Sequence, residues 1–410
     1  MLSPRLILSM VLIAGMLSCR SDSTAARTIV RPEKIRSWRE VYYDQDTYKK
    51  LADLWKEYNR AYPSEDAYAN WMYASRYAQT ENYETLLDKG LKKYPANPTL
   101  LYLAAVKRPN DVDWSAPRRL LERAAELDPT YNDPWFMLAV NYMQEGNHER
   151  STEALRHLLE NSAVTEDVMD YSYNTLLALD KDAILITNGD NDTYPAWILT
   201  RVVKFRPDVV IVNRSLMNTD WYPMRVMDEG APAFTTPDQI KSNREHTPPP
   251  WSDTLIVQLA GAAQRAGRSL YFDLTGPSSP TLARIKENGR ITGLALQVTN
   301  LQSPYVDALR ASTSTWLNGF RIGGLDSWRL HNAKSGDAGR MLTGNYAAVL
   351  LMEMDSLRVC ASDLLPPLFD WYRNHLEPVL ADEFVTGFGK KWCEVLKTPD
   401  VQEWCRQKGF

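Results

Sequence analysis

The feature that most constrains this chain is a change of hydrophobic period near residue 180. Over residues 45 to 178 apolar residues recur at helical spacing between prolines, asparagines and glycines. The run Ala183-Ile184-Leu185-Ile186-Thr187 is instead short, continuous and rich in β-branched residues, as in strands that are buried on both faces. The sequence therefore predicts an α+α/β chain: a helical arm at 45–178, an α/β domain with a small parallel sheet at 179–340 and a C-terminal helical region at 341–410.

The clearest helical hairpin is predicted over residues 133–159. Four residues at i, i+3, i+4 and i+7 share one face of its first helix: Trp135, Leu138, Ala139 and Tyr142. Gly146-Asn147 then supplies a turn. The pattern resembles the tetratricopeptide repeat, with Ser151 in place of the usual alanine. The resemblance implies a solenoid of about three or four hairpins, each of which covers the face that its neighbour leaves open.

The same resemblance implies a protein partner for the arm, bound as an extended peptide or a folded surface in the concave groove. The alternative is a structural arm that only packs on the following domain. Trp55, Trp71, Tyr73 and Trp135 are candidate groove residues. Aromatic residues at helical spacing are, however, more often packed between helices.

The N-terminus predicts export. One positive charge at Arg5 precedes an apolar run that is too short to span a bilayer, since a spanning helix needs about 20 residues. Residues 1–18 are therefore interpreted as a signal peptide. Met16-Leu17-Ser18-Cys19 resembles the lipobox of bacterial lipoproteins, in which the cysteine is acylated, commonly with palmitate. The resemblance implies lipid on Cys19, a tether over residues 19–44, and membrane anchoring in the cell envelope, on a periplasmic or outer-membrane face. The alternative is an ordinary secretory signal.

Composition excludes some classes of function. The net charge is −4 and no basic stripe is present, which argues against a nucleic-acid partner. The five histidines are scattered and the spacings of common zinc sites are absent, so we expect no metal and no cofactor. Of the four cysteines, Cys393 and Cys405 could pair in an exported protein, but Cys360 makes the remaining count odd and leaves the pairing open.

The α/β domain is predicted to begin with a right-handed βαβ unit. A second continuous apolar run, Val209-Val210-Ile211-Val212, follows the first strand by about 25 residues, with a helical stretch at 194–205 between them. A helix at 253–266 leads to a third strand at 269–274, and residues 292–298 are a candidate fourth strand.

Polar segments follow the first two strands, and ligands of open parallel sheets bind beyond the carboxyl ends of the strands. Their amides, carboxylates and tryptophan suit sugar hydroxyls or a hard cation. Gly189 would permit a tight turn or a close backbone approach. The alternative is that these are turn residues, with Asp192 or Thr193 capping the next helix. The candidate ligand-binding residues are Asn188, Gly189, Asp190, Asn191, Asp192, Thr193, Asn213, Asn218, Thr219, Asp220 and Trp221.

The segments TNGDNDTYPAWIL (187–199) and RPDVVIVNRSLMNTDWY (206–222) resemble the soluble C-terminal region of a family of bacterial multi-spanning membrane proteins. Those proteins carry an uncharacterised domain related to protein O-mannosyltransferases. The resemblance extends over roughly residues 180 to 355. This chain lacks the many membrane helices in which the family would catalyse glycosyl transfer. The resemblance therefore implies an accessory soluble module, whose partner is a glycan or a multi-spanning glycosyltransferase-like membrane protein.

These observations leave three hypotheses of function. The first is a non-catalytic binding or scaffolding lipoprotein, which recruits a protein or glycan partner through the repeats and the sheet-edge site. The second is an enzyme, or a subunit of one, in glycan or protein-glycosylation chemistry, with Asp190, Asp192 and Asp220 as acid/base or metal-binding carboxylates. The third is a purely structural assembly subunit. Convergence of the three carboxylates in one pocket would favour the enzyme.

Overall fold

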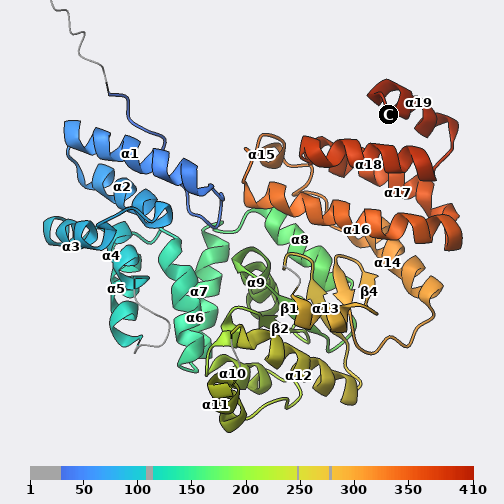
Figure 1. The fold of residues 1–410 in the computed structure, drawn as a ribbon, viewed down its shortest axis with the longest axis horizontal. Coiled ribbons are helices and arrows are strands. Elements are labelled where there is room, and N and C mark those ends of the chain that lie inside the picture. The colour runs from blue at the N-terminus through green and yellow to red at the C-terminus, as the bar shows by residue number, and fades with distance from the viewer. Residues whose placement is uncertain (1–28, 108–113, 247–248, 277–278) are drawn as a thin grey trace, which may run out of the picture.

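The computed structural model describes residues 29–107, 114–246, 249–276 and 279–410. Figure 1 shows a helical arm on the left, a small sheet near the bottom centre and a group of helices on the right. The predicted succession of helical arm, α/β domain and C-terminal helices is confirmed. The predicted signal peptide and Cys19 lie outside the described residues.

Eight helices of the described residues precede the sheet: α1 to α7 pack each against the next, and α8 packs against α9 (Asp190–Trp197), α14 (Tyr305–Gly319) and α16 (Ala338–Cys360). The turn predicted at Gly146-Asn147 is present, because Gly146 has a φ of +76° and Asn147 caps the next helix by accepting from Arg150 N–H at 3.0 Å. Ser151 is buried and donates to the carbonyl of Ala139 at 2.8 Å, which fits a small polar residue where alanine was expected. The helices are α1 (Gln45–Ala61), α2 (Glu65–Ala78), α3 (Tyr83–Lys93), α4 (Pro98–Ala105), α5 (Ser115–Leu127), α6 (Asp133–Gln144), α7 (His148–Glu160) and α8 (Glu166–Leu177).

Residues 29–44, which we call the strap, were predicted to be part of a tether, and for this segment the prediction is wrong. The Ile35 N–H donates to Asn70 on α2 at 3.2 Å, and the Trp38 N–H donates to the Tyr73 hydroxyl, also on α2, at 3.2 Å. Ile35 and Val41 are buried. Removal of these apolar side chains from water favours the folded position of the strap.

The strap also lies over α4 and α6. Arg39 donates to the hydroxyl of Tyr102 on α4 at 3.4 Å and to Asp133 on α6 at 3.1 Å. Alternate helices of the arm, α2, α4 and α6, therefore share one face, and the strap of the same chain covers it. Beyond that face the strap reaches the C-terminal region, where Tyr42 N–H donates to the carbonyl of Gly336 at 2.8 Å.

A five-stranded sheet in the order β2-β1-β3-β5-β4 forms the centre of the α/β domain. β1 is parallel to both β2 and β3, as predicted. The predicted fourth strand at 292–298 contains β5, but β5 forms a hairpin with β4 that turns at Gly293, whose φ is +57°. β5 runs antiparallel to β3, so the sheet is mixed and not parallel throughout. The strands are β1 (Ile184–Thr187), β2 (Val210–Asn213), β3 (Leu270–Asp273), β4 (Arg290–Thr292) and β5 (Ala295–Gln297).

Helices cover the sheet and lead out of it. The stretch after β1 is α-helical and then continues as a π-helix, which ends at Lys204 in the left-handed region. The helical elements of this domain are α9 (Asp190–Trp197), the π-helix Ile198–Val203, the 3-10 helix Leu216–Asn218, α10 (Tyr222–Asp228), α11 (Pro237–His246), α12 (Trp251–Arg265) and α13 (Pro280–Lys286).

The C-terminal helices have a hydrophobic core of their own, which begins earlier than the predicted boundary at residue 340. Leu309 and Trp316 belong to it, and so do Val168 and Tyr171 of α8. Cys393 and Cys405 form a disulfide across Cα atoms 6.0 Å apart, and Cys360 is free. The helical elements are α14 (Tyr305–Gly319), α15 (Trp328–His331), α16 (Ala338–Cys360), α17 (Leu365–Trp371), α18 (Asp382–Val395) and α19 (Pro399–Lys408), with short turns at Ser362–Leu364, Tyr372–Leu376 and Glu377–Val379.

One carboxyl group lies inside this C-terminal core. Glu353 on α16 is 4% exposed, and its Oε1 has no hydrogen-bond partner among the described residues. Burial raises the pKa of Glu353 to about 8. The folded protein therefore holds a proton that the unfolded chain releases above pH 4.5, and this position lowers stability as the pH rises through that window.

We predict that Glu353→Gln removes this pH dependence. The free energy of unfolding of the variant, relative to the parent, should rise by about 1.4 kcal/mol per pH unit between pH 5 and 8. Urea denaturation at several pH values measures the difference. A constant difference across that range would contradict the prediction.

Candidate functional site

The two polar segments predicted to share one edge of the sheet do lie together. β1 and β2 are in parallel register, with Thr187 opposite Asn213 at their carboxyl ends. The Asn213 side-chain amide donates to the Thr193 hydroxyl at 2.9 Å, and the hydroxyls of Thr187 and Thr193 are 2.7 Å apart. All three side chains are buried. These buried residues join the strands to α9 beneath the edge.

Asp192 is a helix cap. Its carboxylate is buried and accepts the backbone N–H groups of Asn188 at 2.7 Å and Gly189 at 2.8 Å, and the hydroxyl of Thr275 also donates to it. Burial raises the pKa of Asp192, although these hydrogen bonds act to lower it. Gly189 has an extended φ of −131° and open space beside it, so no tight turn requires glycine there. The capping interpretation of Asp192 fits, and the open space beside Gly189 leaves a close approach by a ligand as a prediction.

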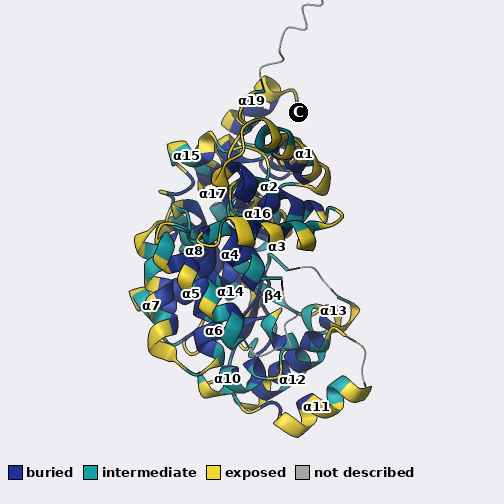
Figure 2. Cartoon of the chain, turned by 90° about the vertical axis from the view of Figure 1, so that its left-hand side faces the viewer, coloured by how far each residue is buried: buried dark blue, intermediate teal, exposed yellow. Residues whose placement is uncertain are grey.

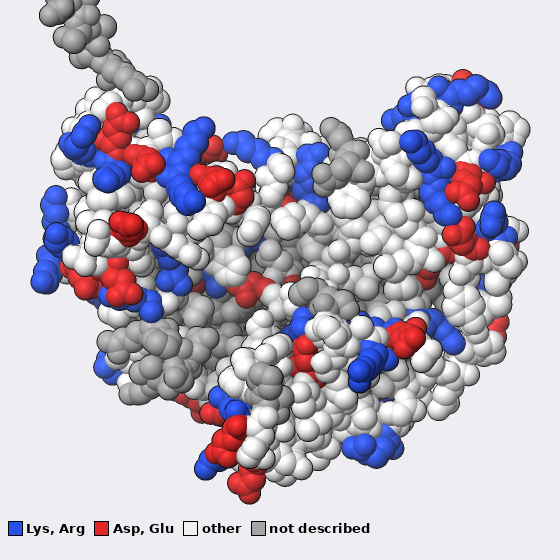
Figure 3. Space-filling view, viewed as in Figure 1, with Lys and Arg blue, Asp and Glu red and all other residues white. Residues whose placement is uncertain are grey.

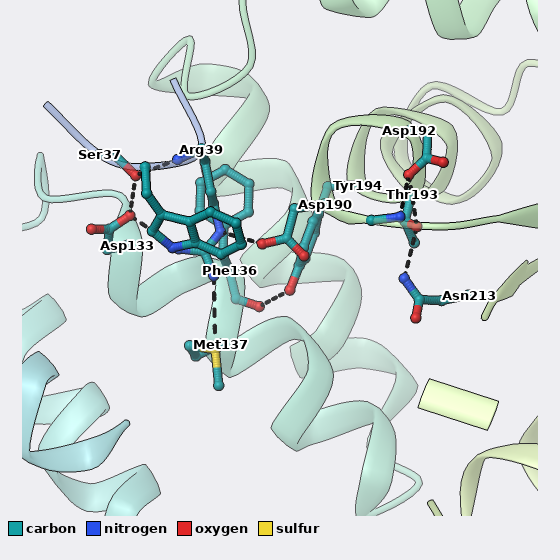
Figure 4. Close-up of polar contacts among 12 residues, drawn as sticks. Ser37, Arg39, Asp133, Phe136, Met137, Asp190, Asp192, Thr193, Tyr194 and Asn213 are labelled. Atoms are coloured by element: carbon teal, nitrogen blue, oxygen red, sulfur yellow. Dashed lines mark hydrogen bonds and ion pairs between the residues drawn. The ribbon is translucent and has the colours of Figure 1, made fainter. Parts of the chain in front are cut away.

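Asp190 points away from Asp192, toward the strap (Figure 4). Its Oδ2 is 2.8 Å from Arg39 Nε, while Arg39 Nη1 is 3.1 Å from Asp133 Oδ1 on α6. The Arg39 side chain is 6% exposed. Burial alone lowers the pKa of Arg39, but its neighbours, Asp190 foremost, raise it well above its ordinary value. Arg39 therefore stays charged and joins the strap, the arm and the sheet edge.

The segment after β2, residues 218–221, makes its contacts away from Asp190 and Asp192. The Asp220 side chain is 75% exposed and forms an ion pair with Arg244 at 2.8 Å. Asn218 accepts from the N–H of Ser252 at 3.0 Å. Thr219 donates to the carbonyl of Leu216, and the half-buried Trp221 packs edge-to-face on Tyr222. The segment therefore anchors the start of α12.

The three candidate carboxylates thus share an edge of the sheet but not a pocket. Asp190 neutralises a buried arginine, Asp192 caps α9 and Asp220 lies at the surface. Among the described residues no group of three or more His, Cys, Asp or Glu side chains is placed to hold a metal ion.

A different pair of carboxylates meets at this edge. Asp273 ends β3 and is buried, and Tyr171 of α8 donates to it at 3.0 Å. The backbone N–H of Thr275 donates to Asp273, while the Thr275 hydroxyl donates to Asp192. Burial, and then the charge of Asp192, raise the pKa of Asp273 to about 8. The pair therefore carries a proton at neutral pH. Asp273 is not among the residues predicted from the sequence, although it ends a strand of the sheet as Thr187 and Asn213 do.

An accessible polar layer remains above this buried pair. Asn188, Asn191 and Thr275 are half-buried. In the part of the chain that the structure describes, the side-chain amides of Asn188 and Asn191 make no hydrogen bond. Gly276 lies directly against Asn188, since a Cβ placed there would come within 3.1 Å of the asparagine Cβ.

Comparison with known families supports part of the resemblance. Residues 168–245, from α8 to α11, match the model of TMEM260-associated domain 2, a family linked to the O-mannosyltransferase-like TMEM260. This range contains both polar segments of the candidate site. No curated protein and no solved structure matches the chain significantly. None of the helices in the described ranges is long and apolar enough to span a bilayer.

Removal of the charge of Asp192 should change the free energy of unfolding more than removal of the charge of Asp220. Asp192→Asn replaces an oxygen acceptor of backbone N–H groups by an amide donor in a buried position. We expect it to lower the free energy of unfolding by about 1–3 kcal/mol. Asp220→Asn alters an exposed ion pair and should change it by less than about 0.5 kcal/mol. Urea denaturation of both variants tests this, and equal effects would show that Asp192 is not a structural cap.

Proposed function

We propose that this protein is a non-catalytic binding or scaffolding lipoprotein of the bacterial cell envelope, which recruits a protein or glycan partner. The observation that carries the proposal is the separation of Asp190, Asp192 and Asp220 into three independent internal contacts. Glycoside hydrolysis needs two carboxyl groups that flank one bond at about 5–10 Å from each other, both open to the sugar. The candidate carboxylates do not offer such a pair.

The accessible layer at the sheet edge suits a glycan. Sugar hydroxyls both donate and accept hydrogen bonds, and so do the free amides of Asn188 and Asn191. The Thr275 hydroxyl donates to Asp192, which also accepts the backbone N–H of Asn188. The buried Asp192–Asp273 pair beneath them holds this layer in place. The edge would therefore bind a hydroxyl-rich ligand without altering it.

The family match supports a role for this protein that is associated with protein glycosylation. We infer that the α/β domain acts as the accessory module of a multi-spanning, O-mannosyltransferase-like membrane protein, and that the tetratricopeptide-like arm makes protein contacts. A second candidate function, an enzyme of glycan chemistry, rests on the protonated Asp273 beside Asp192. Both carboxyl groups are buried, which favours the binding role.

A glycan array tests the sheet-edge site with the mature protein. We expect binding to mannose-containing or other neutral glycans that Asn188→Ala with Asn191→Ala abolishes. Asn318→Ala, an exposed asparagine on α14, is the matched control and should bind as the parent does. Equal binding by both variants, or no glycan bound at all, would remove the glycan from the proposal. Turnover of a bound glycan that Asp273→Asn stops would favour the enzyme.

Lipid anchoring makes a separate prediction. Cys19→Ala should move the protein from the membrane fraction to the soluble fraction, because one acyl-bearing residue supplies the attachment. Cys360→Ala, which alters the free cysteine of α16, is the control and should leave fractionation unchanged. If Cys19→Ala stays in the membrane fraction, the anchor is not this residue.

A further inference from the structure

A groove opens on the outer side of the arm, where α5, α6 and α7 lie side by side (Figure 2). Its volume is about 450 Å³, within the range of ligand pockets. The half-buried Trp135 of α6 lines the groove, together with the buried Leu138 of α6 and Ala154 of α7. We call this the outer groove.

The floor of the outer groove is held rigidly. The Trp135 ring stacks on the ring of His157, with centroids 3.9 Å apart, and His157 Nε2 lies 2.8 Å from the carbonyl oxygen of Pro129. On the other side, the Tyr142 hydroxyl donates to Glu122 at 2.8 Å and the Arg150 guanidinium covers the Tyr142 ring at 4.1 Å. A floor ordered in advance lowers the entropy cost of binding.

Three glutamates and one arginine, Arg150, line the outer groove, so acidic groups are in excess there. Glu122 is engaged by Tyr142 and by Arg150 at 3.1 Å. Glu126 on α5 and Glu153 on α7 line opposite walls, and their side chains are 66% and 69% exposed. Their only ion-pair contacts among the described residues are to exposed arginines one turn along the same helices, at 3.2 and 3.9 Å. Such surface pairs are weak and exchange readily with another cation.

The opposite side of the arm is already occupied. The strap covers the shared face of α2, α4 and α6 through Asn70, Tyr102 and Asp133. A tetratricopeptide-like array would be expected to receive a peptide on its concave side, but here the chain itself covers that face of the alternate helices. The outer groove remains available.

We propose that the outer groove binds a segment of a protein partner in which lysine or arginine flanks an apolar or aromatic side chain. The apolar side chain packs on the half-buried Trp135, and the cations pair with Glu126 and Glu153 on the two walls. The inference rests on the proposed function and deepens it, since it names the chemistry of the protein segment that the arm contacts; it is independent of the glycan site and of the anchor.

The test uses two peptide libraries and the mature protein. One library holds nine-residue peptides with a central tryptophan or leucine flanked by lysine or arginine, and the other has glutamate in place of the cations. Fluorescence polarisation should detect binding of the cationic set. Charge reversal by Glu126→Lys with Glu153→Lys should weaken that binding about tenfold or more, and added salt should weaken it in the parent.

The matched control reverses two exposed glutamates of α7 that do not line the groove, Glu149→Lys with Glu160→Lys. It has the same net charge as the groove variant and should keep the parent's affinity. The proposal is overturned if the cationic library binds no better than the acidic one, or if the groove and control variants bind equally. Glycan binding by the same preparations reports separately on the proposed function.

Discussion

The buried guanidinium of Arg39 ties the parts of this molecule together. It lies between Asp133 of the arm and Asp190 at the start of α9, over the ring of Phe136. An unpaired charge at such a depth costs several kcal/mol, so the folded state requires both carboxylates to be in place. The strap, the arm and the α/β domain are therefore positioned by one side chain.

This arrangement decides what the polar edge of the sheet can do. Asp190 is paired with Arg39, and a second charged junction forms where the partly exposed Arg329 contacts the buried Asp167 at 3.0 Å and the α16 cap Asp337 at 2.8 Å. Charged groups thus stabilise the contacts between the arm, the sheet and the C-terminal helices. Figure 3 shows a hollow between the arm on the left and the C-terminal helices on the right. The proposed binding sites therefore use other groups: the neutral amides of Asn188 and Asn191, and the outer groove.

The sequence predicted the helices and strands that depend on residues close together in the chain. Continuous β-branched runs predicted β1 and β2, and their parallel pairing placed both polar segments at one edge. The hairpin at Gly293 was missed because a short apolar run does not reveal a turn within it. Asp273 could be predicted from its place at the end of β3. Arg39 could not, because its partners lie far along the chain and nothing near Arg39 distinguishes a buried cation from a solvated tether.

A double-mutant cycle on Arg39→Met and Asp190→Asn tests the central claim most directly. If Arg39 joins the strap to the sheet edge, each single variant should lower the free energy of unfolding, and the double variant should lose less than the sum by more than about 1 kcal/mol. A parallel cycle with Asp133→Asn should give coupling of the same sign. Additive effects of Arg39 and Asp190 would contradict the account.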